Sequence, residues 1–395
     1  MLAGKRILLG VSGGIAAYRA AELARLLMRS GAEVRCVMTR GACEFITPLT
    51  LEALTGEQVH TELFDLTAER EMGHIRLARW ADVMIVAPAT ADILARFASG
   101  ICDNLLTTLF QARRGPVLLA PAMNSAMWEA PATQRNLGLL KDAGVHVVGP
   151  ASGDLACGES GPGRMSEPGD ILEAVCPLLV EQELAGQHWV INAGPTREAW
   201  DDVRTLSNRA SGRLGAQLAG AAAMRGARVM LVAGPGTPAS ASGVERIDVE
   251  TAADMLQACE AAASGADVFV ATAAVSDYRF AEQAAGKLRR GGGDMTVRLL
   301  ENTDIVAYIA AMQQRPHRVV AFAAEAAGHL ARAHEKMRAK RVDAIFANDI
   351  SRMGGELGGG WWLAGKSELE APEMDKAALA AWLVAQVKAL QEDDE

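Results

Sequence analysis

Residues 5–39 read KRILLGVSGGIAAYRAAELARLLMRSGAEVRCVMT. An apolar run at 7–9 leads into a glycine-rich turn, an alanine-rich helical stretch and a second apolar run, which predicts the βαβ unit of a parallel sheet. The glycines at Gly10, Gly13 and Gly14 do not form the G-x-G-x-x-G pattern of a dinucleotide-binding turn. Such a turn offers backbone N–H groups and the hydroxyl of its serine to an anion, so it favours a monophosphate. A tight turn without any ligand is the alternative interpretation.

The same pattern occurs again in the second half of the chain, in residues 188–200 and 212–235. In both copies the helix ends at a Gly-Ala step, where glycine suits a left-handed turn. Near-continuous apolar runs predict further strands that are buried on both faces. These runs lie at 83–89, 116–122, 145–150, 268–275, 318–325 and 343–349. Several end in small or polar residues, at the edge where parallel sheets bind ligands.

The length of the chain, 395 residues, suits two domains. Residues 170–189 predict a helix followed by a polar link, with the boundary near Ala185, which gives domains 1–185 and 186–395. The predicted fold class is α/β, with two domains that each contain a mostly parallel sheet and helices on both faces. Residues 354–365 predict a glycine-rich turn or hairpin, and residues 375–391 predict the last helix.

Charge and cysteine content restrict the class of protein. A net charge of -9 argues against general binding to nucleic acid or to a membrane surface. No apolar run is long enough to span a bilayer, and the N-terminus has no signal-peptide pattern, so we expect a cytoplasmic protein. The six cysteines form no C-x-x-C motif, which fits a reducing compartment with most thiols as small core residues.

The first half carries four motifs in order: MGHIRLARWAD (72–82), APATADILARFASGICDNLLTT (87–108), APAMNSAMW (120–128) and LACGESGPGRM (155–165). Together they resemble the FMN-dependent cysteine decarboxylases, specifically the decarboxylase half of the bifunctional phosphopantothenoylcysteine decarboxylase/phosphopantothenate–cysteine ligases. The resemblance implies a flavodoxin-like domain in which the first glycine turn holds the phosphate of FMN. The FMN neighbours that we expect are Gly10, Ser12, Gly13, Gly14, Thr39, Pro88, Ala89, Thr90 and Asn104.

Three residues are candidates for the decarboxylation. His74 is the candidate base, because imidazole titrates in the working range, although a surface histidine at a helix start is the commoner fate. The resemblance implies that Asn124 donates to the substrate carboxylate and that Cys157 supplies a proton during the return of electrons from the reduced flavin. A turn residue and a buried thiol are the respective alternatives, but the glycine-rich surroundings of Cys157 indicate a mobile flap and not a core position.

The second half carries a further set of motifs, at residues 193–215, 271–279, 286–290, 301–306, 321–325, 336–341 and 347–349. They resemble the ligase half of the same bifunctional family, which implies a Rossmann-like domain and CTP as co-substrate. In that reaction phosphopantothenate forms an acyl-cytidylate, and the amine of cysteine then displaces CMP. Lys336 and Lys340 are spaced i and i+4, hence adjacent on one helix face, which is most often a solvated basic face. In an acidic chain, after a strand that ends in F-A-A-E, a triphosphate site is the better interpretation.

The resemblance also assigns ligase residues. Lys287 should stabilise charge in cytidylyl transfer, and Arg204 and Asn208 should act in the second half-reaction, although Asn208 could instead cap a helix. Mg2+ is implied by the triphosphate chemistry, but the sequence does not fix its ligands. The residues expected to line the CTP site are Ala271, Thr272, Ala273, Asp277, Lys287, Thr303, Asp304, Ile305, Val306, Phe322, Lys336 and Lys340.

The chain departs from the family pattern at four places. It has Ala210 in the S-N-x-S-S-G motif, Thr303 in place of the proline of N-P-D-I, and L-R-R after Lys287 in place of I-K-K. Arginine keeps the charge of lysine but not its geometry. The late loop at 354–362 is glycine-rich, where the family often has acidic, aromatic and asparagine residues.

The leading hypothesis is therefore a bifunctional enzyme of coenzyme A synthesis that takes 4'-phosphopantothenate, cysteine and CTP. The resemblance also implies a homo-oligomer, with trimeric contacts in the decarboxylase half, dimeric contacts in the ligase half and a dodecamer when both combine. A nicotinamide oxidoreductase is a second hypothesis, against which the missing G-x-G-x-x-G counts. A flavin-binding regulatory subunit without catalysis is a third, and such a protein could dispense with His74, Cys157 and a CTP site.

Overall fold

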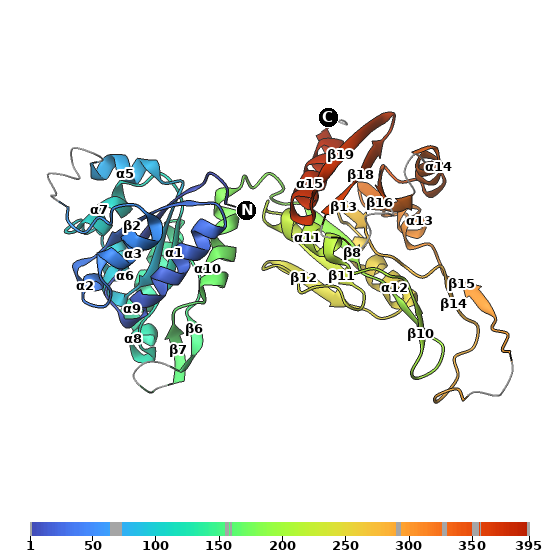
Figure 1. The fold of residues 1–395 in the computed structure, drawn as a ribbon, viewed down its shortest axis with the longest axis horizontal. Coiled ribbons are helices and arrows are strands. Elements are labelled where there is room, and N and C mark those ends of the chain that lie inside the picture. Colours follow the sequence, from blue (N-terminus) through green and yellow to red (C-terminus); the bar gives the residue numbers. More distant parts are fainter. Residues whose placement is uncertain are drawn as a thin grey trace. The chain divides into compact units, whose positions relative to one another are not determined.

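The computed structural model describes residues 2–63, 73–154, 158, 160–289, 294–325, 330–349, 355 and 357–392. The chain folds as two compact units, unit 1 at residues 1–181 and unit 2 at residues 182–395 (Figure 1). Both units are α/β, as the sequence predicts.

Unit 1 is built on a five-stranded parallel sheet with the order β2-β1-β3-β4-β5. Each strand is a short apolar run of the sequence, and β1 and β3 are almost entirely buried, as expected for central strands of a parallel sheet. The strands predicted in this half are confirmed, although the last of them forms only two residues. The strands are β1 (Arg6–Val11), β2 (Glu33–Met38), β3 (Val83–Ala89), β4 (Val117–Pro121) and β5 (His146–Val147).

The helices of unit 1 connect and cover these strands. The core cluster joins Leu8, Met84 and Val86 of the sheet to helices α5, α6, α7 and α9, while α1 packs against both α3 and α10. The helices are η1 (Ile15–Tyr18), α1 (Arg19–Arg29), α2 (Arg40–Cys43), α3 (Pro48–Thr55), α5 (His74–Trp80), α6 (Ala91–Ala98), α7 (Leu105–Ala112), α8 (Ser125–Glu129), α9 (Pro131–Asp142), α10 (Pro168–Val175) and η2 (Cys176–Leu179).

In the chain, an antiparallel hairpin lies between β5 and α10 of unit 1. Its strands are β6 (Ala151–Asp154) and β7 (Ser160–Arg164). The hairpin is anchored on the loop that follows β4, because the N–H of Met123 donates to the carbonyl of Gly163 at 3.0 Å. A Cβ on Gly163 would lie 2.2 Å from the carbonyl oxygen of Met123, so the two backbones can approach this closely only with glycine here.

Unit 2 contains an eight-stranded sheet with the order β12-β11-β8-β13-β16-β17-β18-β19. The first six strands are parallel, in the 3-2-1-4-5-6 order of the Rossmann fold, and the last two are antiparallel. The strands are β8 (His188–Ala193), β11 (Arg228–Ala233), β12 (Val244–Asp248), β13 (Val268–Ala271), β16 (Arg318–Glu325), β17 (Ala344–Asp349), β18 (Leu357–Ala364) and β19 (Ser367–Asp375).

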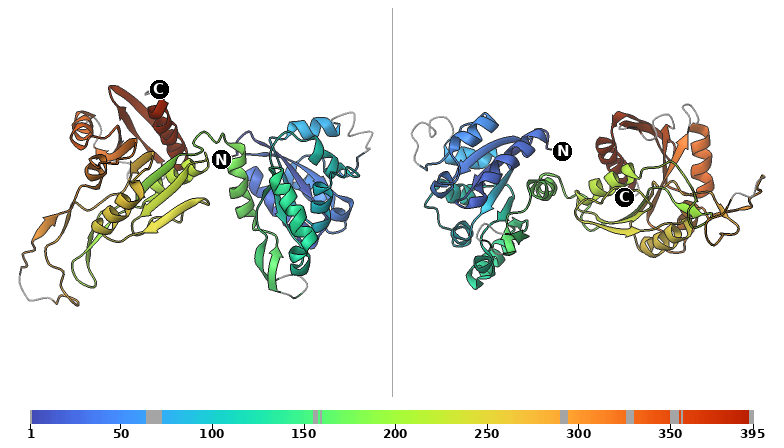
Figure 2. Two further views of the ribbon diagram at one scale, coloured as in Figure 1. Left: turned by 180° about the vertical axis from the view of Figure 1, so that it is seen from behind. Right: turned by 60° about the horizontal axis from the view of Figure 1, so that its bottom comes forward.

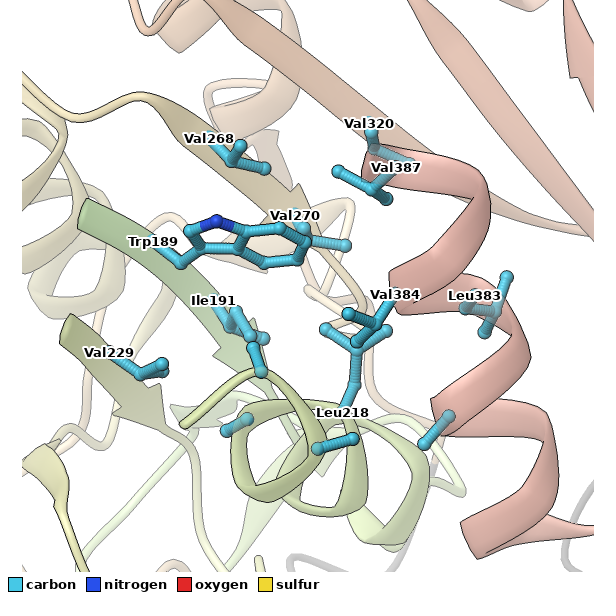
Figure 3. Close-up of a cluster of buried hydrophobic side chains, with 14 of the residues drawn as sticks. Trp189, Ile191, Leu218, Val229, Val268, Val270, Val320, Leu383, Val384 and Val387 are labelled. Atoms are coloured by element: carbon cyan, nitrogen blue, oxygen red, sulfur yellow. The ribbon is translucent and has the colours of Figure 1, made fainter. Parts of the chain in front are cut away.

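Helices cover both faces of this sheet, as predicted. On one face, α11 (Arg213–Ala223) and α15 (Lys376–Glu392) pack over Trp189 and Ile191, and Figure 3 shows Leu218, Val384 and Val387 gathered around the indole ring. Trp189 is fully buried, and its indole N–H donates to Oε1 of Gln187 at 2.8 Å. The other face is covered by α12 (Ala252–Ala263), α13 (Ile305–Ala310) and α14 (Leu330–Lys340).

The two predicted Gly-Ala steps are confirmed as left-handed helix ends. Gly31 follows α1 and Gly226 follows α11, and both have a φ of 95°. A side chain at either position would be strained, because only glycine adopts this region freely. In each case the chain then enters the next parallel strand directly.

Two short antiparallel arms extend from unit 2 (Figures 1 and 2). One pairs β9 (Arg197–Ala199) with β10 (Thr205–Ser207), and the other pairs β14 (Tyr278–Phe280) with β15 (Leu299–Glu301). The arms carry Arg204 and Lys287 and therefore decide where two of the predicted ligase residues lie.

The glycine-rich segment at 354–365 is not a turn. Its described part is mainly strand β18, which pairs with β17 and with β19, so the hairpin alternative holds and the turn lies after Ala364. Glycine at position 360 is required by packing, since a Cβ there would lie 2.2 Å from the carbonyl oxygen of Ala347. A Cβ on Gly358 would lie 2.8 Å from Cδ2 of Leu379, a side-chain atom that can shift.

Candidate active sites

The first candidate site lies at the carboxyl ends of β1 and β3. The order β2-β1-β3-β4-β5 is the flavodoxin-like order, in which the ligand binds at the switch point between the first and third strands. Ser12, which follows β1, is buried at 2% exposure. Its hydroxyl donates to the carbonyl of Pro88 at 2.8 Å and accepts from the N–H of Thr90 at 3.1 Å. This hydroxyl therefore joins the two loops at the switch point.

The glycines that follow Ser12 leave room at this point. A Cβ on Gly13 would lie 2.7 Å from the carbonyl carbon of Gly41, and one on Gly14 would lie 3.3 Å from Cγ2 of Thr90. Within the described parts of the chain, the N–H groups of Gly13 and Gly14 donate to no carbonyl oxygen. Open backbone donors in a turn that any side chain would crowd fit the phosphate end of a flavin mononucleotide.

Two of the expected FMN neighbours have a structural function as helix caps. The hydroxyl of Thr39 accepts from the N–H of Ala42 at 3.2 Å, and Oδ1 of Asn104 accepts from the N–H of Thr107 at 3.0 Å in a capping box. Thr39 follows β2, so its turn lies beside the one after β1. Asn104 begins α7, which packs against the helix that carries His74.

The decarboxylase candidates lie on three different segments. His74 is the first residue of α5 and is partly exposed. Asn124 follows β4 and caps α8, because its Oδ1 accepts from the N–H of Met127 at 2.9 Å. The hairpin β6–β7 packs against this cap, since a Cβ on Gly161 would lie 2.6 Å from Oγ of Ser125. Cys157 lies outside the described residues, between the two strands of that hairpin.

Four of the five described thiols are poor nucleophiles by environment. Burial raises the pKa of Cys36 and of Cys259 to about 12. Burial also raises the pKa of Cys176 and of Cys43. These four groups stay protonated thiols near neutral pH, which leaves Cys102, exposed on a loop, as the accessible thiol among the five described.

The second candidate site is a cavity of about 630 Å³ in unit 2. It spans the carboxyl edge of the sheet between β8 and β13, which is the switch point of the Rossmann order. Buried Asn192, at the end of β8, fixes its wall by accepting from the N–H of Ala273 at 3.0 Å. The predicted residues that line it are Asn208, Ala271, Thr272, Ala273, Asp277, Thr303, Asp304, Ile305, Val306, Phe322, Lys336 and Lys340.

The cavity wall carries more positive charge than the sequence motifs indicate. Lys340 pairs with Asp304, with 2.8 Å between Nζ and Oδ2. Arg213 and Lys376 also line the cavity, as the first residues of α11 and α15. The pKa of Lys376 is lowered by burial and by its proximity to Arg213. The sequence motifs single out neither residue, although Arg213 lies within the motif at 193–215, and the two are brought together only by the fold.

Asn208 does not cap a helix. The residue before α11 is Gly212, which has a φ of 63°. The Asn208 amide instead donates to the carbonyls of Ala274 at 3.2 Å and Val275 at 2.9 Å, and so joins the loop before α11 to the loop that follows β13. The helix-cap alternative is therefore wrong, and Asn208 lies in the cavity wall.

Close packing lets α11 approach the cavity. A Cβ on Gly215 would lie 2.3 Å from Oγ1 of Thr272 and 2.5 Å from Cβ of Ala193. Glycine at this position brings the start of the helix against both central strands, as the last glycine of a dinucleotide-binding turn does. The backbone of residues 212–215 thereby forms part of the cavity wall.

Arg204 and Lys287 do not line this cavity. Arg204 lies in the turn of the β9–β10 arm, where its Nη1 is 3.2 Å from Oδ2 of Asp201. Lys287 is exposed in the segment between β14 and β15. The structure brings these two residues toward each other through Asp201, which also accepts from the N–H of Leu288 at 3.1 Å.

In the described ranges, no three His, Cys, Asp or Glu side chains are grouped so that they could hold a metal ion. None of the helices that the structure describes combines the length and the apolar character needed to cross a membrane.

The two sites define a two-domain α/β protein with a flavodoxin-like mononucleotide site and a Rossmann-like cavity. The family described as "Flavoprotein" matches residues 1–180, and "DNA/pantothenate metabolism flavoprotein C-terminal domain" matches residues 184–390. A protein of Vibrio vulnificus named "Coenzyme A biosynthesis bifunctional protein CoaBC" is 44% identical over 98% of each chain. The protein of the same name from Escherichia coli is 46% identical over 89% of this chain and 87% of its own.

Among solved structures, the C-terminal domain of a "Coenzyme A biosynthesis bifunctional protein CoaBC" is 30% identical, with a TM-score of 0.47. The match covers 54% of this chain and 100% of the solved chain. Because its sequence matches these relatives over most of their length, the chain belongs to the family of bifunctional CoaBC proteins of coenzyme A biosynthesis.

Proposed function

We propose that the chain catalyses two consecutive steps of coenzyme A biosynthesis. Unit 2 joins 4'-phosphopantothenate to cysteine at the expense of CTP, and unit 1 decarboxylates the resulting phosphopantothenoylcysteine to 4'-phosphopantetheine. The observation that carries the proposal is the similarity to bifunctional CoaBC proteins at 44% to 47% identity over most of the chain. The two switch-point sites support it, because each contains predicted residues of one activity.

In unit 1, the loop at residues 12–14 holds the phosphate of FMN through open backbone N–H groups, and the turns at Thr39 and Thr90 flank it. When bound, FMN supplies a two-electron acceptor that is restored at the end of the reaction, so that the carboxyl group leaves next to an oxidised carbon–sulfur centre. His74 accepts a proton from the substrate, and Asn124 hydrogen-bonds the departing carboxylate. Cys157 returns a proton as the product forms.

In unit 2, the cavity holds CTP and the acid substrate together, because both reacting groups must meet at one edge of the sheet. Lys336, Lys340 and the start of α11 place positive charge near a triphosphate, which lowers the cost of bringing two anions together. The carboxylate attacks the α-phosphate, an acyl-cytidylate and pyrophosphate form, and the amine of cysteine then displaces CMP. Lys287 stabilises the charge of the first step, and Arg204 and Asn208 orient the acyl-cytidylate for the second.

Mg2+ enters this scheme with CTP. The ion keeps several waters and binds phosphate oxygens together with one or two carboxylates, so a site made of protein ligands alone is not needed. Asp277 and Asp304 line the cavity, and Asp277 is the one that would hold such an ion, because Asp304 already accepts from the N–H of Ala307 and pairs with Lys340. Lys340, paired with Asp304, is held at the cavity wall, and Mg2+ bound there with CTP would supply further screening of the phosphates.

A homo-oligomer in the cytoplasm completes the proposal. Four large apolar side chains around the FMN turn are exposed in the single chain: Ile15, Tyr18, Phe45 and Leu49, at 48% to 69% exposure. Such exposure supports burial against another subunit, as in the trimeric contacts expected for this half. The five described cysteines are free thiols, which fits a reducing compartment.

One experiment tests the two activities together. Purified protein is incubated with 4'-phosphopantothenate, cysteine, CTP and Mg2+, and CMP, pyrophosphate, CO2 and 4'-phosphopantetheine are measured. We expect all four in equal amounts, with phosphopantothenoylcysteine accumulating when FMN has been removed. Formation of CMP that does not depend on 4'-phosphopantothenate, or a colourless protein that takes up no flavin, would contradict the proposal.

A further inference from the structure

One buried carboxylate lies in the turn of the β9–β10 arm. The side chain of Asp201 is fully buried, yet it belongs to an arm that extends from the sheet (Figure 1). Its Oδ1 accepts from the N–H of Val203 at 2.8 Å and from the N–H of Arg204 at 2.7 Å. Its Oδ2 lies 3.2 Å from Nη1 of Arg204. Backbone and guanidinium of Arg204 are thus both fixed by the same carboxylate.

The same turn holds the other arm. Oδ2 of Asp201 accepts from the N–H of Leu288 at 3.1 Å, and Oδ2 of Asp202 accepts from the N–H of Gly286 at 2.9 Å. The N–H groups on both sides of Lys287 are therefore held by two consecutive aspartates. We call Trp200, Asp201 and Asp202 the clasp.

Trp200 completes the clasp through its ring and its backbone. The guanidinium carbon of Arg204 lies 5.3 Å from the centroid of the indole, which is a cation–π distance. The ring also stacks on Phe280 of the second arm, with 5.7 Å between centroids and an interplanar angle of 13°. The carbonyl of Trp200 accepts from the N–H of Ala284 at 3.0 Å. Both arms therefore contact one indole.

The charge of Asp201 is kept in spite of its burial. Burial alone would raise its pKa, but the N–H groups of Val203, Arg204 and Leu288 together with the charge of Arg204 outweigh this, and the net pKa is lowered. Removing a carboxylate from water costs folding free energy, and the three backbone donors and the guanidinium of Arg204 offset this cost for Asp201. An amide in its place would have one acceptor oxygen fewer.

We propose that Asp201 is a positioning residue of the ligase, which sets Arg204 and Lys287 in fixed relation to each other. The inference rests on the proposed function, because Arg204 and Lys287 are there assigned to different half-reactions. One carboxylate therefore couples the two steps: its loss displaces the guanidinium used for cysteine attack and the loop that carries the lysine used for cytidylyl transfer. Asp201 is not among the residues that line the CTP cavity.

The test uses the full chain with Asp201→Asn, in which the amide nitrogen faces a backbone donor. The matched control is Asp248→Asn, the same substitution at a carboxylate that is 73% exposed and paired with Arg246. Pyrophosphate release without cysteine reports cytidylyl transfer, and CMP release on addition of cysteine reports the second half-reaction. Decarboxylation of supplied phosphopantothenoylcysteine reports whether unit 1 is intact.

We expect Asp201→Asn to lower kcat of both half-reactions by about tenfold or more, because displacements of about 1 Å have such effects. KM for CTP should stay within about twofold, since the cavity wall is not touched, and decarboxylation and the control variant should match the wild type. A merely structural role would lower the unfolding temperature or change KM for CTP without this split.

Unchanged kcat in both half-reactions, or a loss in only one of them, overturns the inference. If Asp201→Asn fails to fold, Asp201→Glu, which keeps the charge but adds a methylene, is measured in the same way, and failure of both to fold shows that Asp201 is structural. Arg204→Gln and Lys287→Gln are assayed alongside. Full ligase activity in those two variants contradicts the proposed function, whereas loss there with normal Asp201→Asn contradicts the inference alone.

Discussion

Gly13→Ala is expected to weaken FMN binding while it leaves the ligase unaffected. The added Cβ would lie 2.7 Å from the carbonyl carbon of Gly41 and 2.9 Å from its Cα and carbonyl oxygen. Carbon atoms in contact lie about 3.5 Å apart, so the turns after β1 and β2 must separate by roughly 0.8 Å. The neighbour is backbone and cannot rotate away, as a flexible side chain would.

The magnitude follows from the cost of overpacking. Extra methyl groups in tightly packed sites cost about 1–3 kcal/mol. If that strain is released only by opening the phosphate turn, FMN affinity falls by about 5- to 150-fold, at about 1.4 kcal/mol for each factor of ten. The structure thus predicts a protein that folds and is purified with substoichiometric flavin.

The assay is flavin titration by fluorescence on the apoprotein, together with the absorbance of bound flavin per chain. Gly138→Ala is the matched control, because Gly138 lies in α9 and a Cβ there meets nothing within 4 Å. Alanine also has the higher helix propensity, so this control should bind FMN normally and be slightly more stable. FMN affinity of Gly13→Ala within twofold of the control would refute the assignment of this turn as the phosphate cradle.

Four further predictions concern other parts of the chain. His74→Asn should abolish CO2 release while CMP formation persists, and Lys287→Gln should do the reverse; coupled loss of both activities in either variant would argue against separate sites. Lys340→Met should raise KM for CTP by about tenfold, since it removes a cation and leaves Asp304 unpaired in the cavity, with Lys366→Met on the β18–β19 turn as the control. In native protein at pH 8, a maleimide should modify Cys102 before Cys36 and Cys259, whose pKa values are raised by burial to about 12, and mass spectrometry of peptides decides the order. Asp82→Asn should destabilise unit 1 at pH 7, because the side-chain hydrogen bond from Arg6 lowers the pKa of Asp82. This contribution is fully present above the unfolded pKa of about 3.9 and is lost as pH falls through the folded pKa, so the difference in urea unfolding between variant and wild type should begin to shrink below about pH 4.

The strands of both sheets could be predicted because they are continuous apolar runs. Val83–Ala89 is buried along its whole length, and the run at 318–325 forms β16. In contrast, β18 contains three consecutive glycines and has no side-chain alternation to indicate a strand. Gly360 is required by the close approach of the Ala347 backbone, which belongs to another strand, so the local sequence pattern cannot indicate it.

The same distinction applies to the sites. Motifs contiguous in sequence, such as Thr303–Val306, led to the cavity wall, because the chain leaves β15 and enters α13 at that edge. Arg213 and Lys376 belong to helices more than 150 residues apart in sequence, and only the fold brings them together. Arg204 and Lys287 are joined through one carboxylate, a relation that spacing along the chain does not encode.

Each described core cluster lies within one unit, and residues 180–187 run between η2 and β8. This covalent join fixes the two catalysts at one copy each per translated chain, whatever the level of expression. A cell therefore makes the ligase and the decarboxylase in equal numbers. The ligase product, which carries a free thiol and a carboxylate, always meets as many copies of the unit that consumes it.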